Sequence, residues 1–262
     1  MYHFRPSPCY AVRADKRPFG QRPETRARIA WTGPPRRTLH GPQAGPAVRP
    51  PYWDDATRAL GRADPVMRRL IRGIEGAHLT RRGDAFTTLS RAIVGQQISV
   101  KAAQSIWNRF TQASGAGTDA LALGVRLDPA RVARMRLQKL RTCGLSERKA
   151  DYLRDLARHF TNGTLDPAAW PALDDEALIE RLTDVKGIGR WTAEMFLIFH
   201  EMRADVFPVG DIGLQNAIAR HYNDDERLPI DGMREIAVAW QPWRSVASWY
   251  LWRSLDPIPV EY

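Results

Sequence analysis

The sequence predicts an all-α fold. From Tyr52 onward, apolar residues recur three and four positions apart, which is the spacing of one face of a helix. No segment shows the convincing alternation of apolar and polar residues that marks a half-buried β-strand. Short turns separate the periodic segments, and several segments begin with Asp or Ser, which cap helix N-termini. We therefore expect residues 52–262 to form a helical domain.

Two helices are predicted in the first half of this domain. Asp84 begins one of them and Ser99 begins the other. Their apolar faces consist of Phe86, Leu89, Ile93 and Val94 in the first helix and of Ala102, Ala103, Ile106, Trp107 and Phe110 in the second. The sequence GQQI (residues 95–98) joins them, so we expect a tight turn there.

Further helices follow in the second half. Ser146 is a suitable N-cap for a helix, and Asp174 or Asp175 begins another that runs to Leu182. The segment VKGIGR (residues 185–190) comes next, and residues 191–201 are again helical. Two helices joined by a Gly-x-Gly turn form an αα-hairpin. The remaining helices are expected over residues 212–222, 231–240 and 243–255.

The hairpin is the most informative of these elements. Glycines at 187 and 189 permit a close approach that side chains would prevent, so the amides that begin the next helix can face an anion. A DNA phosphate fits this description, and Lys186 and Arg190 would add positive charge beside it. Taken alone, Gly-x-Gly is also typical of an ordinary helix C-cap with a tight turn. The motifs around the hairpin decide between these interpretations.

Positive charge is unevenly distributed along the chain. A formal charge of +10 and an isoelectric point near 10.1 favour a polyanionic partner such as nucleic acid. Residues 1–50, however, hold ten Lys and Arg against two Asp and Glu, whereas the remaining residues hold 29 against 27. A DNA-binding face in the folded part must therefore come from the placement of charges.

The leader, residues 1–51, is rich in Arg, Pro and Gly and has no sustained periodicity, so we expect it to be disordered. Three interpretations are open: a basic arm on DNA phosphates, an Arg-rich targeting segment, or an extension without function. Its many prolines argue against the amphipathic helix of a targeting peptide. We favour an extension or passive tail.

Other classes of site and location are disfavoured. Cys9 and Cys143 cannot supply a disulfide framework or a four-thiolate cluster, so we expect a reducing compartment. No stretch approaches the roughly 20 apolar residues of a membrane helix, and the N-terminus lacks a signal-peptide pattern. His200 and His221 have no partners at a metal-ligand spacing. We expect a monomeric, bacterial, cytoplasmic and nucleoid-associated protein without a cofactor or catalytic metal.

Four segments together resemble the DNA-3-methyladenine glycosylase II family of helix-hairpin-helix DNA glycosylases. They are RAIVGQQIS (91–99), LTDVKGIGRWTAEM (182–195), DVFPVGD (205–211) and WQPWRS (240–245), and they occur in the family's order. The resemblance implies a two-lobed all-α fold with a DNA cleft between the lobes and the hairpin on one rim. It implies the short form of the family, the catalytic core without an additional N-terminal β-rich domain. Its partner would be double-stranded DNA that contains alkylated bases.

In this resemblance Asp211 is the catalytic carboxylate. Cleavage of the bond between C1′ and a purine nitrogen develops positive charge on the sugar, which a fixed anion stabilises. Asp211 could also orient the attacking water. It is equally suited to cap the helix that begins at Ile212, and the two roles are compatible because the helix dipole favours the ionised carboxylate.

Trp191, Met195 and Trp243 would form the substrate pocket. Bifunctional relatives have a lysine at the position of Trp191, and tryptophan cannot form their Schiff base, so the expected product is an intact abasic site. The absence of a cysteine cluster also excludes the iron-sulfur cluster of the endonuclease III branch. Tryptophan faces favour cationic methylpurines through cation-π attraction. Met195 aligns with the family's pocket tyrosine and leaves the preferred base open. The other tryptophans, such as Trp107, Trp249 and Trp252, are expected in the core.

The remaining candidate residues would contact DNA. Gln97, with Ile98 beside it, occupies the turn in which the family inserts a wedge into the base stack. The resemblance also assigns DNA contacts to Lys186, Gly187, Gly189, Arg190, Thr192 and Arg244, and it implies a monovalent cation on hairpin carbonyls near Val185 and Gly187. Two rival functions are a non-catalytic lesion-binding module, which would need neither Asp211 nor an aromatic pocket, and a glycosylase for deaminated or oxidised bases, which would need polar pocket groups.

Overall fold

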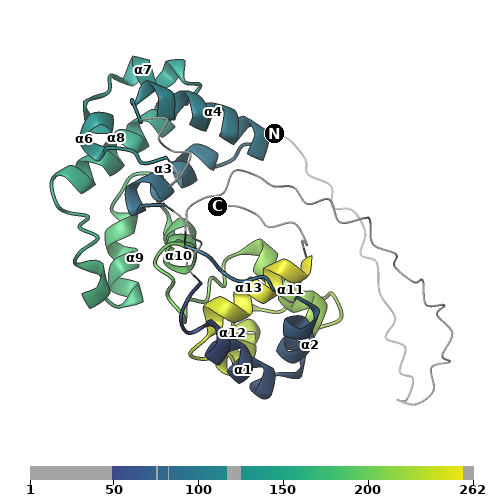
Figure 1. The fold of residues 1–262 in the computed structure, drawn as a ribbon. Coiled ribbons are helices and arrows are strands. Elements are labelled where there is room, and N and C mark those ends of the chain that lie inside the picture. The colour runs from purple at the N-terminus through teal and green to yellow at the C-terminus, as the bar shows by residue number, and fades with distance from the viewer. Residues whose placement is uncertain (1–48, 75, 82, 117–124, 256–262) are drawn as a thin grey trace, which may run out of the picture. The chain divides into compact units, whose positions relative to one another are not determined.

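The computed structural model describes residues 49–74, 76–81, 83–116 and 125–255. Within these ranges every regular element is a helix and there is no β-strand, which confirms the all-α prediction (Figure 1). No helix in the described ranges is long and apolar enough to cross a membrane. The expectations about the leader concern residues that lie almost entirely outside the described part.

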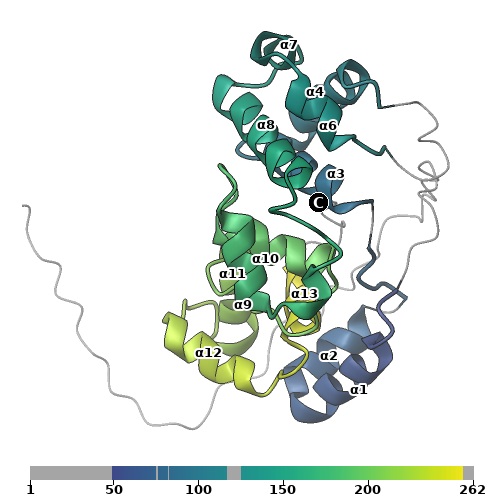
Figure 2. The same ribbon diagram turned by 90° about the vertical axis from the view of Figure 1, so that its left-hand side faces the viewer.

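Five helices from the first half of the domain form one lobe. They are α3 (Ala85–Gly95), α4 (Val100–Ala113), α6 (Pro129–Arg134), α7 (Leu137–Thr142) and α8 (Glu147–Thr161). α8 is central because it packs against α3, α6 and α7 (Figure 2). Its residues Leu153 and Leu156 are fully buried, as their helical spacing requires.

The second lobe is built from helices at the start and at the end of the described chain. It contains α1 (Trp53–Ala63), α2 (Pro65–Gly73), α11 (Ile212–Tyr222), α12 (Ile230–Val238) and α13 (Arg244–Leu255). The buried Asp64 carboxylate caps α2 and also accepts hydrogen bonds from the Tyr222 hydroxyl at 2.7 Å and the Trp240 indole at 2.8 Å. A buried carboxylate is stabilised only when its oxygens are paired, so these bonds fix the N-terminal helices onto the C-terminal ones.

Two helices lie between the lobes. After a short 3-10 turn, η1 (Trp170–Ala172), the chain forms α9 (Asp175–Thr183), and the hairpin then leads into α10 (Arg190–Phe199). α10 packs against α9 and α3 and is followed by the strand-free segment that reaches α11 (Figure 1). The two-lobed arrangement that the resemblance implied is therefore present.

The predicted helix starts are largely confirmed. The side chains of Asp84, Ser99, Ser146 and Asp174 each accept a hydrogen bond from a backbone amide in the first turn of their helices. The helix predicted over 231–240 occupies Ile230–Val238 and ends earlier than expected. The amides of residues 239–241 donate to carbonyls three residues back, so the chain leaves the α-helical pattern there and tightens into turns.

Candidate active site

Asp211 lies at the N-terminus of α11, and three groups hold its carboxylate. Oδ1 accepts the backbone amide of Leu214 at 2.7 Å, so Asp211 is the N-cap of the helix. The same oxygen accepts the indole N–H of Trp252 at 2.8 Å, and Oδ2 accepts the indole N–H of Trp191 at 2.8 Å. The two indoles and the Leu214 amide therefore hold the carboxyl group in one orientation at the positive end of the α11 helix dipole.

Trp252 contacts Asp211, which the sequence analysis did not predict. It was expected in the core with Trp249, but it is only partly buried, stacks on Phe199 with ring centroids 5.7 Å apart, and directs its N–H at Asp211. Trp249 and Trp107 are buried as expected. Because α13 follows α11 by a long stretch of chain, no local pattern could show that one of its tryptophans meets Asp211.

Trp191 combines contact with Asp211 and exposure to solvent. It is the second residue of α10, and its side chain is 41% exposed although its N–H is bonded to the carboxylate. Ile212, which follows Asp211, is 63% exposed. An exposed aromatic face and an exposed aliphatic side chain therefore flank the carboxylate, as an apolar contact surface for a base would require.

The two hairpin glycines differ in their backbone conformation and in the space around them. Gly187 adopts a φ of +82°, and a Cβ there would lie 2.1 Å from Cδ2 of Tyr152 on α8. Gly189 has an ordinary φ of −93°, and a Cβ there would meet no described atom within 4 Å. Gly187 is thus required by the fold, whereas the space at Gly189 is open to a molecule outside the chain.

The start of α10 is a suitable place for an anion. Gly189 is its N-cap, and it has no side chain that could accept the amides of the first turn. The amides of a first helical turn lie at the positive end of the helix dipole and attract phosphate. The open space at Gly189 would let a DNA backbone reach these amides.

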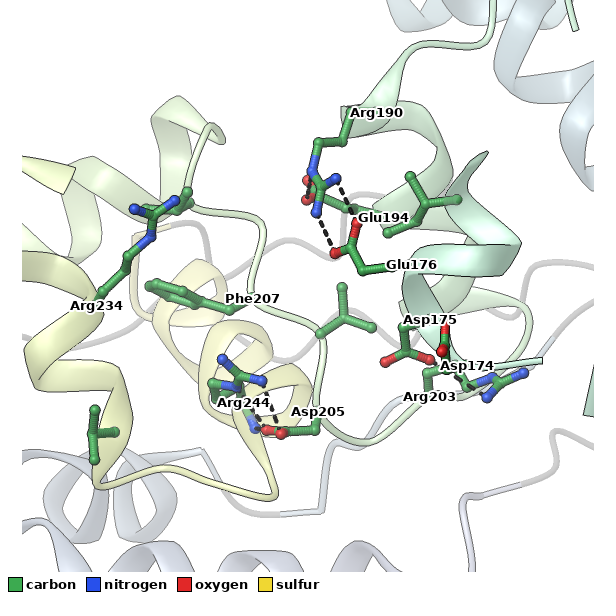
Figure 3. A pocket seen from close by; sticks show the side chains of 14 residues that line it. Asp174, Asp175, Glu176, Arg190, Glu194, Arg203, Asp205, Phe207, Arg234 and Arg244 are labelled. Carbon is green, nitrogen blue, oxygen red and sulfur yellow. Dashed lines mark hydrogen bonds and ion pairs between the residues drawn. The ribbon is translucent and has the colours of Figure 1, made fainter. Parts of the chain in front are cut away.

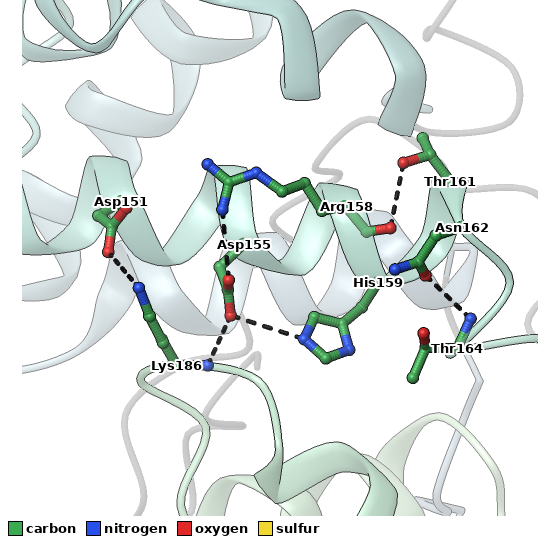
Figure 4. Close-up of polar contacts among 8 residues, drawn as sticks. All are labelled: Asp151, Asp155, Arg158, His159, Thr161, Asn162, Thr164 and Lys186. Carbon is green, nitrogen blue, oxygen red and sulfur yellow. Dashed lines mark hydrogen bonds and ion pairs between the residues drawn. The ribbon is translucent and has the colours of Figure 1, made fainter.

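Two carboxylates of α8 hold the hairpin loop. The buried Asp155 accepts the backbone amide of Lys186 at 3.0 Å, and it also lies near Arg158 and His159 (Figure 4). The Lys186 ammonium lies 3.3 Å from Asp151 and is exposed. This exposed pair is weak, so Lys186 is available to a phosphate, and its predicted DNA contact stays a prediction.

Arg190 is engaged within the protein. Its guanidinium donates to both oxygens of Glu176, at 2.8 and 2.6 Å, and to Glu194 at 3.0 Å (Figure 3). The Glu194 side chain is buried, and burial raises its pKa while the Arg190 charge lowers it. To contact a phosphate, as the resemblance implies, Arg190 would have to leave this pair of carboxylates.

Arg244 is also held by a carboxylate. Its Nε and Nη2 donate to the two oxygens of Asp205 at 2.8 and 2.9 Å. Both residues line a hollow of about 980 Å³ beside Arg190 and Glu194 (Figure 3). Asp211 and Trp191 are not among the residues that line it, and most of its charged groups pair with one another. This hollow is therefore not the cleft expected around Asp211.

The other two predicted pocket residues are buried or partly buried. Met195 is 6% exposed, and Thr192, which was predicted to contact DNA, is 8% exposed, so both belong to the buried face of α10. Trp243 is partly buried and stacks on Tyr52 with ring centroids 5.7 Å apart. Of the three predicted pocket residues, the structure brings only Trp191 into a described contact with Asp211. The pocket roles of Met195 and Trp243 stay predictions.

The predicted wedge residues project from the turn between α3 and α4. Gln97 is exposed and adopts a φ of +57°, and Ile98 is 37% exposed. A left-handed backbone at a residue other than glycine is uncommon and frequently marks a functional position. The turn also touches the hairpin, because the Gln96 side-chain amide donates to the Gly187 carbonyl at 2.9 Å.

The carbonyls expected to bind a monovalent cation are each already accepting one hydrogen bond. The Val185 carbonyl accepts from the Ile188 amide at 3.1 Å, and the Gly187 carbonyl accepts from Gln96. A carbonyl oxygen has two lone pairs, so each can still coordinate a cation. No cluster of three or more His, Cys, Asp or Glu suited to a metal occurs in the described ranges.

Comparison with known proteins agrees with this geometry. Residues 90–242 match the family model of the HhH-GPD superfamily base excision DNA repair proteins. A putative DNA-3-methyladenine glycosylase of Bacillus subtilis is 36% identical over 171 residues, which are 65% of this chain and 59% of that protein. This chain thus spans less than two thirds of that relative's length.

Two solved structures are also similar. A DNA-3-methyladenine glycosidase from Bacillus halodurans has a TM-score of 0.69 and 33% identity, over 80% of this chain and 91% of that one. A 3-methyladenine DNA glycosylase from Schizosaccharomyces pombe in complex with abasic DNA has a TM-score of 0.64 and 30% identity, over 79% and 98%. The family match covers more than half of the chain and includes the turn between α3 and α4, the hairpin, Asp211 and Trp191. The chain belongs to the HhH-GPD superfamily of base excision DNA repair proteins.

Proposed function

We propose that this protein is a monofunctional DNA glycosylase that flips alkylated purines out of duplex DNA and hydrolyses their glycosidic bonds. The observation that carries the proposal is the Asp211 carboxylate, held by the indoles of Trp191 and Trp252 at the N-terminus of α11. Relatives and solved neighbours named 3-methyladenine DNA glycosylases support the substrate class.

The chemistry follows from a fixed anion beside the sugar. As the bond between C1′ and the purine nitrogen breaks, its electron pair leaves with the base and positive charge grows on the sugar ring. The Asp211 carboxylate stabilises that charge, and its hydrogen bonds keep it in place without reorganisation during the reaction. Water then adds to C1′ and gives its proton to Asp211 or to solvent, which leaves an abasic site.

Alkylated purines suit this site because they need little acid catalysis. Methylation at N3 or N7 places a positive charge on the purine, and this charge weakens the glycosidic bond. The base becomes neutral as it departs with the electron pair of that bond. The exposed Trp191 face would attract the cationic base by roughly 0.5 to 2 kcal/mol more than a neutral one. In this proposal the protein acts as a monomer on double-stranded DNA.

The test is chromatography of the free bases released from methylated duplex DNA, with gel analysis of the DNA strand. We expect release of methylpurines, an unbroken strand until alkali treatment, and no covalent adduct after borohydride reduction, because tryptophan replaces the Schiff-base lysine. Tight binding of lesion DNA without release would instead support a lesion-binding module. A borohydride-trapped adduct would contradict monofunctional chemistry.

A further inference from the structure

The turn that carries Gln97 is held from one side by α8. The Lys149 ammonium donates to the carbonyls of Val94 at 2.8 Å and Gln96 at 2.6 Å. Both carbonyls lie at the C-terminal end of α3, where carbonyls lack helical partners and carry the negative end of the helix dipole. A cation at this position satisfies them and ends the helix at a defined residue.

The Gln96 carbonyl is the more informative of the two contacts. It belongs to the peptide group whose nitrogen is that of Gln97, so Lys149 fixes the peptide plane that leads into the left-handed residue. A left-handed backbone is energetically unfavourable at a residue other than glycine, and surrounding contacts must hold it. Charge-assisted hydrogen bonds are suited to do so.

The same face of α8 also holds the hairpin. Lys149, Tyr152 and Asp155 are spaced three residues apart, so they lie near one another along the helix. Tyr152 packs where a side chain at Gly187 would stand, and Asp155 accepts the amide of Lys186. One rigid helix therefore contacts both the turn and the hairpin.

The turn and the hairpin are also joined by a direct hydrogen bond. The Gln96 amide donates to the Gly187 carbonyl, which joins the turn to the hairpin itself. Gln97 and Ile98 remain exposed beyond this bond. The spacing between the phosphate-binding loop and the exposed wedge side chains is thus set by contacts within the protein.

We propose that Lys149 is a positioning residue that holds Gln97 in its left-handed conformation at a fixed place relative to the hairpin. When the hairpin binds a phosphate, Gln97 is then already placed to enter the base stack, so binding of the backbone and extrusion of the base are coupled. The proposal rests on the proposed glycosylase function. It assigns to Lys149 no contact with the reacting atoms.

The test is a double-mutant cycle on single-turnover base release. Lys149→Met removes the ammonium and keeps the apolar stem, and Gln97→Ala removes the wedge side chain but keeps a non-glycine residue. We expect Lys149→Met to slow release from a paired lesion by roughly tenfold. The double variant should be no slower than Gln97→Ala alone, because a turn without its wedge gains nothing from being held.

A second substrate separates positioning from general damage to the fold. A methylpurine placed opposite an abasic site has no base-pairing partner, so its extrusion costs less and needs less help from a wedge. Lys149→Met should be slowed less than about twofold on this duplex. Lys149→Arg, which keeps N–H donors and charge, should recover most of the rate on the paired lesion. Should Lys149→Met not fold, Lys149→Gln carries the same comparison with one donor group.

Lys139→Met is the matched control, because Lys139 is an exposed lysine on α7 with no described contact to the turn. It should release base at the wild-type rate from both duplexes. Equal slowing of Lys149→Met on both duplexes, or additive effects of the two substitutions, would overturn the proposal. A wild type that releases no base from either duplex would instead overturn the proposed function, so the two failures are distinguishable.

Discussion

Asp211 owes its proposed role to the groups that hold it. A lone aspartate at a helix start is usually only a cap, and this one also accepts two indole N–H groups from residues on different helices. Neither indole is charged, so both stabilise the carboxylate without neutralising it. A full negative charge thus remains available to a cationic sugar.

Trp252→Phe should slow base release while leaving DNA binding nearly unchanged. The substitution keeps an aromatic ring against Phe199 but removes one hydrogen bond to the carboxylate. A bond to a charged group is worth about 1.5 to 3 kcal/mol, which corresponds to roughly tenfold or more in the rate. Single-turnover kinetics with a parallel binding titration measure both effects. An unchanged rate would remove Trp252 from the positioning of Asp211, and Trp249→Phe on the same helix is the control for packing.

Glu194 should make stability depend on pH. Burial has the largest effect and raises its pKa, Arg190 offsets part of that rise, and the nearby Glu176 and Asp211 charges add a smaller rise. A raised folded-state pKa contributes stability that is present below the unfolded value and lost as pH rises through the folded value. The melting temperature of Glu194→Gln should therefore gain on that of the wild type as the pH rises from about 4, near the unfolded pKa, toward neutral. A difference in melting temperature that is constant across this window would contradict the assignment.

Within the hairpin, one glycine is required by the fold and the other is not. Gly187 is restricted by its positive φ and by the Tyr152 ring, whereas Gly189 has neither restriction. Their sequence pattern is the same, so the distinction required the structure. It predicts opposite outcomes for the same substitution at the two positions.

Gly187→Ala should lower the melting temperature, because the added Cβ collides with the ring of Tyr152. Gly189→Ala should melt like the wild type and bind duplex DNA more weakly, since its Cβ enters only the space left for a phosphate. Calorimetry and a binding titration distinguish the two variants. Normal DNA binding by a well-folded Gly189→Ala would show that the backbone of DNA does not approach the hairpin there.

The sequence predicted those elements whose signals lie within a few consecutive residues. Asp84, Ser99, Ser146 and Asp174 marked helix starts because capping is a local interaction. α6 and α7 were not predicted individually, since six residues are too few to show a helical period. The hairpin and Trp191 lie in one short motif and Asp211 lies in another, so the sequence could indicate each of them. The contact of Trp252 with Asp211 and the contacts of Lys149 with the turn were missed because they join distant segments.

At the scale of the whole molecule, one lobe is built from both parts of the folded chain. α1 and α2 pack on α13, and Asp64 bonds to Tyr222 and Trp240. No sequence pattern indicates this association, because the partners lie more than 150 residues apart. Trp53 is 3% exposed in the same core, so the folded part includes the helices that precede the motifs of the family.

Residues 49–262 alone should retain the stability and base release of the full chain. Residues 1–48 carry nine Lys and Arg against two Asp and Glu, so any contact they make with phosphates would be visible in the salt dependence of binding. Each contact adds about 0.9 to the slope of log K against log salt. We expect an unchanged slope for the shortened chain, as a passive leader predicts. A flatter slope would show that the leader binds DNA.

Asp211→Asn is the sharpest test of whether the Asp211 carboxylate supports cleavage of the glycosidic bond. Asparagine can keep the cap on Leu214 and the bond from Trp252 through its oxygen, but it loses the charge and presents an amide to the Trp191 N–H. The measurement is single-turnover release of methylpurines from methylated duplex DNA, with binding of the same duplex determined in parallel. We expect the variant to release base at least about a hundredfold more slowly and to bind the duplex equally or more tightly. Release at a rate near that of the wild type would remove the Asp211 carboxylate from the reaction.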